Sequence, residues 1–329
     1  MRDRMDRRRM MEGAGASLVS LGLASLAGCA TSPATGAPAG QMSTGAASGK
    51  PASQLEATEL ATGVKLITGA GANVLAARGP EGALLVDGGL VENAPGLIER
   101  ALRETGADKV ASLINTHWHP EQTGANDLLG PKGARILAHE NTRLWMGTQI
   151  IVRWQGGKVY PPRQPKARPS ETFYTKKEAP LGNERVELGY LLQAHTDGDI
   201  YVHFRKANVM AVGGVVAGKG WPVIDWETGG WIGGMVRGLE TLIAQADDAT
   251  VIVPADGPTL TRQDLIKQRD MYVAIMGRLK TMMESGFSAD KVLTGAPAAE
   301  FEAERGDPSQ FLRLAFRSFW GHVRQFDVV

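Results

Sequence analysis

Apolar and polar positions follow two different patterns along the chain from about Leu55 onward. Short runs of β-branched and aliphatic residues, separated by glycines, predict buried strands. Between the third and fourth of these runs, apolar side chains recur at helical spacing, and Gly106 marks the end of the predicted helix. The strands predicted in this first part of the chain are 64–68, 73–77, 83–86 and 110–115.

The second part of the chain repeats this order. Three strand-like runs precede a helical segment at 239–244, and one more strand follows it. From Thr261 onward the spacing is helical. We therefore expect an α+β domain of two related halves, with a helical tail from about residue 261. The predicted strands here are 185–192, 200–204, 208–212 and 250–253. The apolar face of the tail consists of Leu265, Met271, Ile275 and Leu279.

The composition agrees with a globular domain and narrows the choice of partners. Of 329 residues, 43% are hydrophobic and 22% are charged, which is enough apolar material for a buried core. Forty-one glycines favour a fold rich in loops and strands over a helical bundle. The net charge of +1 gives no strong field toward nucleic acid, so we expect none as a partner. The single cysteine, Cys29, excludes an intramolecular disulfide and a cysteine-rich zinc site.

Residues 1–29 have the layout of a secretory signal. Five arginines precede Met10, a weakly apolar stretch follows at 14–27, and small residues close the segment. The apolar stretch is shorter than the roughly 20 residues that a membrane-spanning helix needs. Its end, Leu26 to Cys29, resembles the bacterial lipobox, in which the cysteine is lipidated and becomes the first residue of the mature protein.

The resemblance implies a lipid anchor at Cys29, on the periplasmic face of a bacterial membrane. Acyl chains contribute about 0.8 kcal/mol per buried methylene, so two or three would hold the protein stably. Ala30 stands where inner-membrane lipoproteins carry aspartate, which favours the outer membrane. Arg7 to Arg9 resemble a twin-arginine export signal, and the general secretory route stays open. The alternative is an ordinary buried cysteine after an N-terminal helix.

Residues 30–54 are expected to form a flexible linker. They are rich in Gly, Ala, Ser, Thr and Pro and hold few bulky apolar side chains, so they cannot bury enough surface to become ordered. The folded domain is therefore predicted to span 55–329.

Three clusters of polar residues follow predicted strands, at 116–124, 194–199 and 254–257. His117 and His119 are two residues apart in an extended loop, so they can point the same way and share one ion. His195 would complete a set of three imidazoles with an open position for water or substrate. A zinc ion in such a site lowers the pKa of its water to about 7.

In order and spacing these clusters, together with Asp87, resemble the metallo-β-lactamase superfamily from about Leu60 to Leu260. The resemblance implies a four-layer αββα sandwich, here with a C-terminal helical extension. The family motif is His-x-His-x-Asp-His, followed by a histidine, a bridging aspartate and a final histidine. This chain keeps three of the histidines and departs from the motif at four positions: Glu121, Gln122, Gly214 and Asp256.

The remaining ligands favour one zinc ion, bound by His117, His119 and His195. The second pocket would offer Glu121 and Asp256, a hard, oxygen-rich set that suits Mg²⁺, Mn²⁺ or Ca²⁺ better than zinc. Gly214 supplies no bridging carboxylate between two ions.

Each acidic or amide residue near the site has more than one interpretation. Glu121 could act as general base on the zinc-bound water, or form a salt bridge away from it. Asp256 could hold a water or a second cation, or cap its turn. Gln122 is a poor metal ligand and is assigned to positioning of substrate or loop. Asp87 is expected to brace the metal loop through hydrogen bonds.

Ordinary structural roles are expected for the other histidines. His139 follows a predicted strand at 135–138 and is expected at the surface or at a helix start, His203 in a strand and His322 in the tail helix. The tryptophans are by default core residues. As an alternative, the Trp- and Gly-rich stretch 216–231 could form a mobile rim at the pocket mouth.

Two functions follow from the resemblance. The first is a zinc-dependent hydrolase of a small ester, lactone, amide or thioester. The second is a non-catalytic lipoprotein that uses the altered pocket to bind a ligand or partner. The three retained histidines favour the hydrolase, because a site without metal has little need for them.

Overall fold

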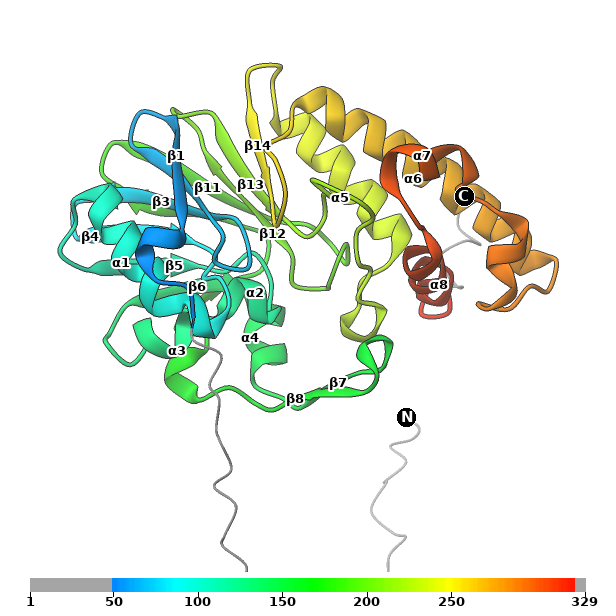
Figure 1. Ribbon diagram of the computed structural model, residues 1–329, viewed down its shortest axis with the longest axis horizontal. Coiled ribbons are helices and arrows are strands. Elements are labelled where there is room, and N and C mark those ends of the chain that lie inside the picture. Colours follow the sequence, from blue (N-terminus) through cyan, green and yellow to red (C-terminus); the bar gives the residue numbers. More distant parts are fainter. Residues whose placement is uncertain (1–48, 323–329) are drawn as a thin grey trace, which may run out of the picture. The chain divides into compact units, whose positions relative to one another are not determined.

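Two β-sheets pack face to face in the part of the chain that the structure describes, residues 49–322 (Figure 1). The structure is a computed structural model. The predicted signal segment, Cys29 and most of the predicted linker lie outside the described residues.

The first sheet has seven strands in the order β1-β2-β3-β4-β5-β6-β9. Its first four strands are antiparallel, and β4, β5, β6 and β9 run parallel to one another. The bounds are β1 Glu56–Ala61, β2 Val64–Thr68, β3 Val74–Gly79, β4 Gly82–Val86, β5 Val110–Ile114, β6 Arg135–His139 and β9 Glu171–Phe173.

The second sheet has five strands in sequence order, of which only β13 and β14 pair in parallel. The bounds are β10 Lys176–Leu181, β11 Glu184–Tyr190, β12 Ile200–Phe204, β13 Val209–Gly213 and β14 Val251–Pro254. A separate hairpin, β7 Ile150–Val152 and β8 Lys158–Tyr160, stands apart from both sheets.

Helices cover the outer face of each sheet (Figure 1). On the first sheet lies α1 Ala94–Thr105, with α2 Pro120–Thr123, α3 Asn126–Leu129 and α4 Glu140–Met146 in the connections that follow β5 and β6. On the second sheet lie α5 Ile232–Gln245 and α6 Arg262–Glu284, and α7 Glu302–Arg305 and α8 Ser309–Ser318 lie beyond them. The 3₁₀ turns are η1 Ala52–Gln54, η2 Val91–Asn93, η3 Arg153–Gln155, η4 Pro165–Ala167, η5 Trp226–Thr228, η6 Lys291–Gly295 and η7 Ala299–Phe301.

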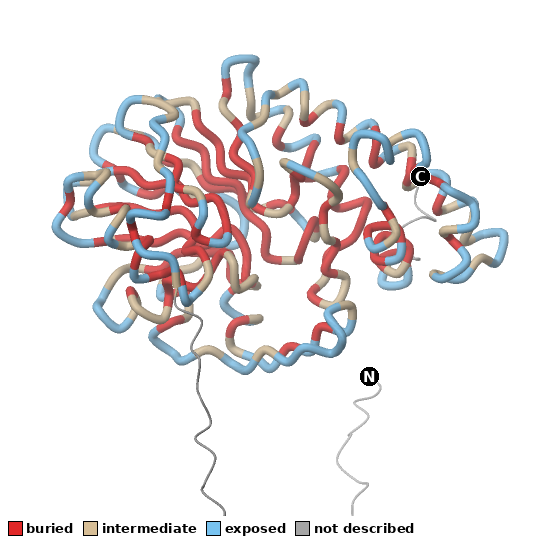
Figure 2. Tube along the Cα trace, in the orientation of Figure 1, coloured by how far each residue is buried: buried red, intermediate tan, exposed pale blue. Residues whose placement is uncertain are grey.

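The two-residue period of the strands divides their side chains between the layers. In β12, Ile200, Val202 and Phe204 face the core between the sheets, whereas Tyr201 packs under the helices of the second sheet. Both faces of the central strands are therefore buried, as the concentration of buried positions in Figure 2 shows. The predicted αββα sandwich with C-terminal helices is confirmed.

The predicted strands correspond to β2–β6 and β11–β14 and lie within two residues of them, and Gly106 ends α1 in the left-handed conformation (φ 62°). The sequence missed β1, whose composition is half polar, the β7–β8 hairpin, β9 and β10. Packing also begins before Leu55. Ala52 is 3% exposed, and the Lys50 amide donates to Asn93.

The other histidines differ in part from expectation. His139 ends β6 and caps α4 by accepting from the Asn141 amide, but it is 3% exposed and not on the surface. His203 is a strand residue, as predicted. The placement of His322 in the tail helix was wrong, because α8 ends at Ser318 and the His322 ring stacks on Trp231 beyond it. Among residues 49–322, no helix combines the length and apolar character that crossing a membrane requires.

Candidate metal centre

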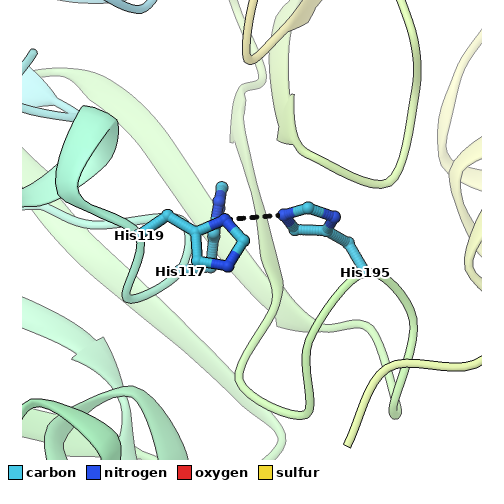
Figure 3. Close-up of side chains that lie close together, drawn as sticks. All are labelled: His117, His119 and His195. Atoms are coloured by element: carbon cyan, nitrogen blue, oxygen red, sulfur yellow. Dashed lines mark hydrogen bonds between the residues drawn. The ribbon is translucent and has the colours of Figure 1, made fainter. Parts of the chain in front are cut away.

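The structure brings together the three histidines that the sequence singled out (Figure 3). His117 and His119 lie in the loop after β5, and His195 lies in the loop between β11 and β12. One ligand nitrogen from each ring lies within 4.8 Å of the others, and His119 Nδ1 is 3.1 Å from His195 Nε2. Three imidazoles at this spacing can share one ion.

The second nitrogen of each ring is held by another part of the protein. His195 Nδ1 donates to the Val223 carbonyl at 2.7 Å, and His117 Nδ1 lies 3.1 Å from Thr116 Oγ1. His119 Nε2 contacts the carboxylate of Asp225 at 3.0 Å. These contacts leave His117 Nε2, His119 Nδ1 and His195 Nε2 for an ion, and such outer contacts fix the orientation of ligand rings.

The buried surroundings of His117 and His195 favour their neutral form, in which histidine binds metal. Burial is the largest cause that lowers the pKa of His117, followed by the neighbouring His195 and His119 rings. Burial likewise lowers the pKa of His195 to about 3. The donor set therefore fits a borderline cation such as zinc.

Asp225, which was not predicted from the sequence, lies in the segment between β13 and α5. Its side chain is fully buried and accepts hydrogen bonds from His119 Nε2 and from Thr228 Oγ1 at 2.7 Å. Burial, the largest cause, raises the pKa of Asp225, but His119, Thr228 and His195 together outweigh it, and the pKa is lowered. Thr228 in turn accepts from Trp118 Nε1 at 3.1 Å. Only the isolated acidic character of Asp225 and Glu227 within 216–231 could have drawn attention to this residue.

Asp87 lies behind the metal loop, where the sequence analysis expected it to act as a brace. Its carboxylate accepts from the Thr116 amide at 2.8 Å and from Thr116 Oγ1, which also contacts His117 Nδ1. Burial raises the pKa of Asp87 to about 7. Through Thr116, Asp87 can set the position of the His117 ring.

The histidines lie at the bottom of a pocket of about 340 Å³. Glu121, Gln122 and Asp256 all line it, together with Trp154, Gln155 and part of the segment 214–223. Asp256 is 62% exposed and forms an ion pair with Lys219 Nζ at 2.7 Å. Asn73, directly before β3 of the first sheet, holds the loop that carries Asp256. Its Nδ2 donates hydrogen bonds to the carbonyls of Pro254 and Gly257.

Gly214 leaves no room for the bridging carboxylate of a second metal. A Cβ at this position would lie 2.4 Å from Cδ2 and 2.6 Å from Nε2 of His195. The ring of the metal ligand thus occupies the space that a side chain at 214 would need. The position of Gly214 supports one ion at the three histidines rather than a pair of ions.

The tryptophans of 216–231 divide between pocket and core. Trp221 lines the pocket, whereas Trp231 is 4% exposed and packs against His322. A second part of the pocket wall comes from Trp154 and Gln155 at the tip of the β7–β8 hairpin, which was not predicted from the sequence. The side chain of Glu227, 5% exposed, joins the two parts by accepting from the Arg153 amide at 2.7 Å and from its guanidinium at 3.0 Å.

A model of the metallo-beta-lactamase superfamily matches residues 67–275, nearly two thirds of the chain, and includes all three histidines. The chain belongs to the metallo-beta-lactamase superfamily. Enzymes of this superfamily are hydrolases of small molecules and generally bind metal, usually zinc. A comparison with curated protein sequences gave no significant match.

Solved structures of superfamily members resemble the chain in fold. A metallo-beta-lactamase from Pontibacter korlensis is 19% identical with a TM-score of 0.53, over 67% of this chain and 99% of the other. The DIM-1 metallo-beta-lactamase is 16% identical with a TM-score of 0.53, over 67% and 97%. The stereoselective inverting sec-alkylsulfatase Pisa1 from Pseudomonas sp. is 13% identical with a TM-score of 0.61; it covers 82% of this chain, which spans half of the sulfatase. At these identities the likeness shows the superfamily fold alone.

Asp199, behind His195, allows a prediction for the metal-free protein. Its buried carboxyl accepts from the Thr196 amide and hydroxyl, and burial raises its pKa to about 8. Between about pH 4, its value in an unfolded chain, and pH 8, the folded state keeps a proton that the unfolded state has released. This contribution to stability is full below pH 4 and is lost as the pH rises through 8.

We therefore expect Asp199→Asn to flatten the fall in stability between pH 5 and pH 8, measured by urea unfolding after chelation. Asp248→Asn, at a side chain that is 97% exposed, is the control for the substitution itself. An Asp199→Asn protein whose stability falls as steeply with pH as that of the wild type would contradict the assignment.

Proposed function

We propose that the protein is a zinc-dependent hydrolase of a small ester, lactone, amide or thioester, with one zinc ion at His117, His119 and His195. The observation that carries the proposal is the convergence of three ring nitrogens at the bottom of a pocket, each on a ring whose other nitrogen is already bound. With three protein ligands and one open position, zinc supplies a Lewis acid and a nucleophile at neutral pH.

The protein's own residues would then bind and orient the substrate. Trp154, from the β7–β8 hairpin, and Trp221, from the segment after β13, provide apolar surface in the pocket. Glu121 lies at the same pocket and is our candidate for the group that accepts the proton of the attacking water. The ion pair of Asp256 with Lys219 makes Asp256 the weaker of the two candidate bases, because its charge already has a partner.

Zinc content and hydrolysis together test the proposal. We expect one zinc per chain in the purified protein, lost on chelation together with activity toward at least one member of a panel of chromogenic esters, thioesters, lactones and lactams. His119→Ala should lose both zinc and activity, while His322→Ala, a histidine outside the cluster, should keep both. Two tightly held zinc ions would refute the single-ion site. One zinc without histidine-dependent hydrolysis would favour the non-catalytic binding protein.

For the location, we propose a lipid anchor at Cys29 that holds the domain on the periplasmic face of a bacterial membrane, preferably the outer one. The residues from Leu26 to Cys29 support this proposal. Cell fractionation tests it: the wild type should sediment with membranes, and Cys29→Ser should appear in the soluble fraction or remain unprocessed. Equal solubility of both proteins would rule out the anchor.

A further inference from the structure

The segment between β13 and α5 has two roles at the metal centre. Val216, Ala217 and Trp221 form one wall of the pocket. Further along the same segment, the Val223 carbonyl accepts from His195 and the Asp225 carboxylate contacts His119. A shift of this segment would therefore alter both the shape of the pocket and the orientation of two histidines.

The middle of the segment is held by the tail helices. Gln268, in α6, is 1% exposed. Its Oε1 accepts from the Ala217 amide at 3.1 Å, and its Nε2 donates to the Ala217 carbonyl at 2.9 Å. The hydroxyl of Tyr272, one turn further along α6, donates to the same Oε1 at 3.3 Å. Gln268 thus satisfies both backbone groups of a buried residue in the pocket wall.

A second set of contacts comes from the region around α7 and α8. Arg305 Nη1 donates to the Gly220 carbonyl at 3.2 Å and lies 3.5 Å from that of Ala217. Trp221 Nε1 donates to the Gly306 carbonyl at 2.9 Å, and its ring stacks on Phe311 with 5.0 Å between centroids. Both ends of the tail therefore contact the same few residues of the wall.

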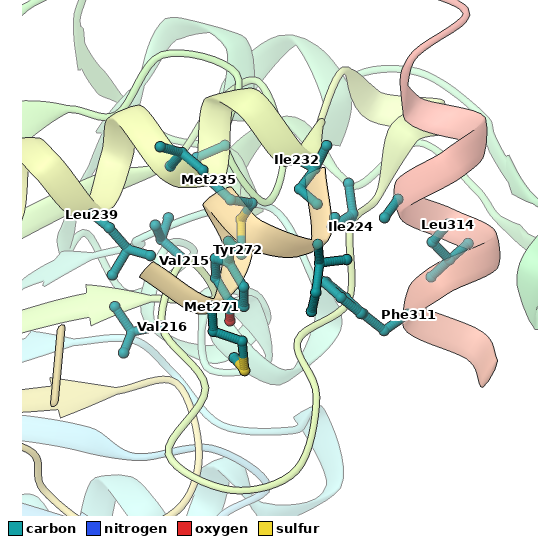
Figure 4. Packing of buried hydrophobic residues seen from close by; sticks show 14 of the residues in the cluster. Val215, Val216, Ile224, Ile232, Met235, Leu239, Met271, Tyr272, Phe311 and Leu314 are labelled. Atoms are coloured by element: carbon teal, nitrogen blue, oxygen red, sulfur yellow. The ribbon is translucent and has the colours of Figure 1, made fainter. Parts of the chain in front are cut away.

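Apolar packing supports these hydrogen bonds. Val215, Val216 and Ile224 of the segment belong to one buried cluster with tail residues (Figure 4). In the close-up, Met271 and Tyr272 lie beside the segment and Phe311 approaches it from α8. Since interiors are close-packed, a displacement of the tail residues that contact the segment is transmitted to it.

We propose that Gln268 is a positioning residue of the metal centre, and that the C-terminal helices act through Ala217 to hold His195 and His119 in place for the ion. This inference rests on the proposed zinc site. It assigns to the tail a role at the reactive pocket, in addition to covering the second sheet.

The test compares Gln268→Leu with Gln263→Leu, the same substitution at an exposed position of the same helix. Leu279→Ala is the second control, because this buried residue lies three turns further along α6 and its loss destabilises the tail without touching Ala217. Zinc affinity is measured by competition with a chromophoric chelator. Hydrogen exchange of residues 215–225 is measured in the metal-free proteins, and urea unfolding reports global stability.

We expect Gln268→Leu to weaken zinc binding by about tenfold, the lower limit for loss of an outer contact at a metal site, and to speed exchange in 215–225. Both controls should bind zinc as the wild type does. Wild-type zinc affinity in a folded Gln268→Leu protein would overturn the proposal, as would an equal loss in Leu279→Ala.

If Gln268→Leu does not fold, Arg305→Met removes the second contact and is judged by the same two measurements. If the wild type itself binds no zinc at the histidines, the proposed function fails. In that case hydrogen exchange in the metal-free proteins decides. Unchanged exchange of 215–225 in Gln268→Leu overturns the role of the tail, and faster exchange supports the contact between tail and segment.

Discussion

Replacing Asp225 with alanine is expected to weaken zinc binding by about 10- to 100-fold and to reduce hydrolysis accordingly. The carboxylate is fully buried and holds His119 Nε2 at 3.0 Å, so its loss frees the ring to rotate and leaves its N–H without a buried acceptor. Competition with a chelator measures the affinity, and activity measured with excess zinc separates weaker binding from a slower reaction.

Asp225→Asn separates the charge from the hydrogen bond. The amide oxygen can still accept from His119 and Thr228, so we expect an effect between those of the wild type and alanine. Glu227→Gln, two residues along the same segment, is the control because Glu227 contacts Arg153 and not the histidines. If Asp225→Ala retains the zinc affinity of the wild type, Asp225 does not orient a metal ligand.

The second large effect on zinc affinity is expected from the single methyl group that Gly214→Ala adds. Gly214→Ala would place a Cβ 2.4–2.6 Å from the His195 ring, closer than real Cβ contacts allow. Either the ring or the backbone must move, so we expect zinc affinity to fall at least as far as in Asp225→Ala. The measurement is the same competition assay, with the chain's fold checked by circular dichroism.

Gly277→Ala supplies the matched control for this substitution. Gly277 lies inside α6, and apart from its own helix backbone a methyl group added to it would meet nothing within 4 Å. Alanine should therefore stabilise the helix by about 0.5–1 kcal/mol and leave zinc binding unchanged. A Gly214→Ala protein with intact zinc affinity would show that the His195 ring has room to move. A second metal ion at this site would then no longer be excluded by Gly214.

The sequence could predict the three-histidine centre because its signal is local. His117 and His119 lie two residues apart, directly after a buried strand, and His195 lies in a second polar cluster that also follows a strand. Asp225 could not be predicted in the same way. It reaches His119 across 106 residues of sequence, and no spacing rule connects the two positions before the sheets are packed together.

The fold shows the same division between local and distant information. The central strand β13, Val-Met-Ala-Val-Gly, is buried along its whole length and is a continuous apolar run, so its position was predicted closely. The edge strand β1 has the mixed sequence Glu-Ala-Thr-Glu-Leu-Ala and gave no strand pattern. In the tail, the helical spacing predicted α6. The burial of the polar residue Gln268 could not be predicted, because it depends on hydrogen bonds to Ala217 in a distant segment.

The contact between Glu227 and Arg153, which joins two parts of the pocket wall, has a consequence for which of the two residues can vary during evolution. Glu227 receives one hydrogen bond from the backbone amide at residue 153 and one from the arginine side chain. The amide is present whatever residue stands there, proline excepted, so half of the link persists through most changes at 153. Among natural relatives that share this hairpin, we would look for an acidic residue kept at 227 beside a variable 153.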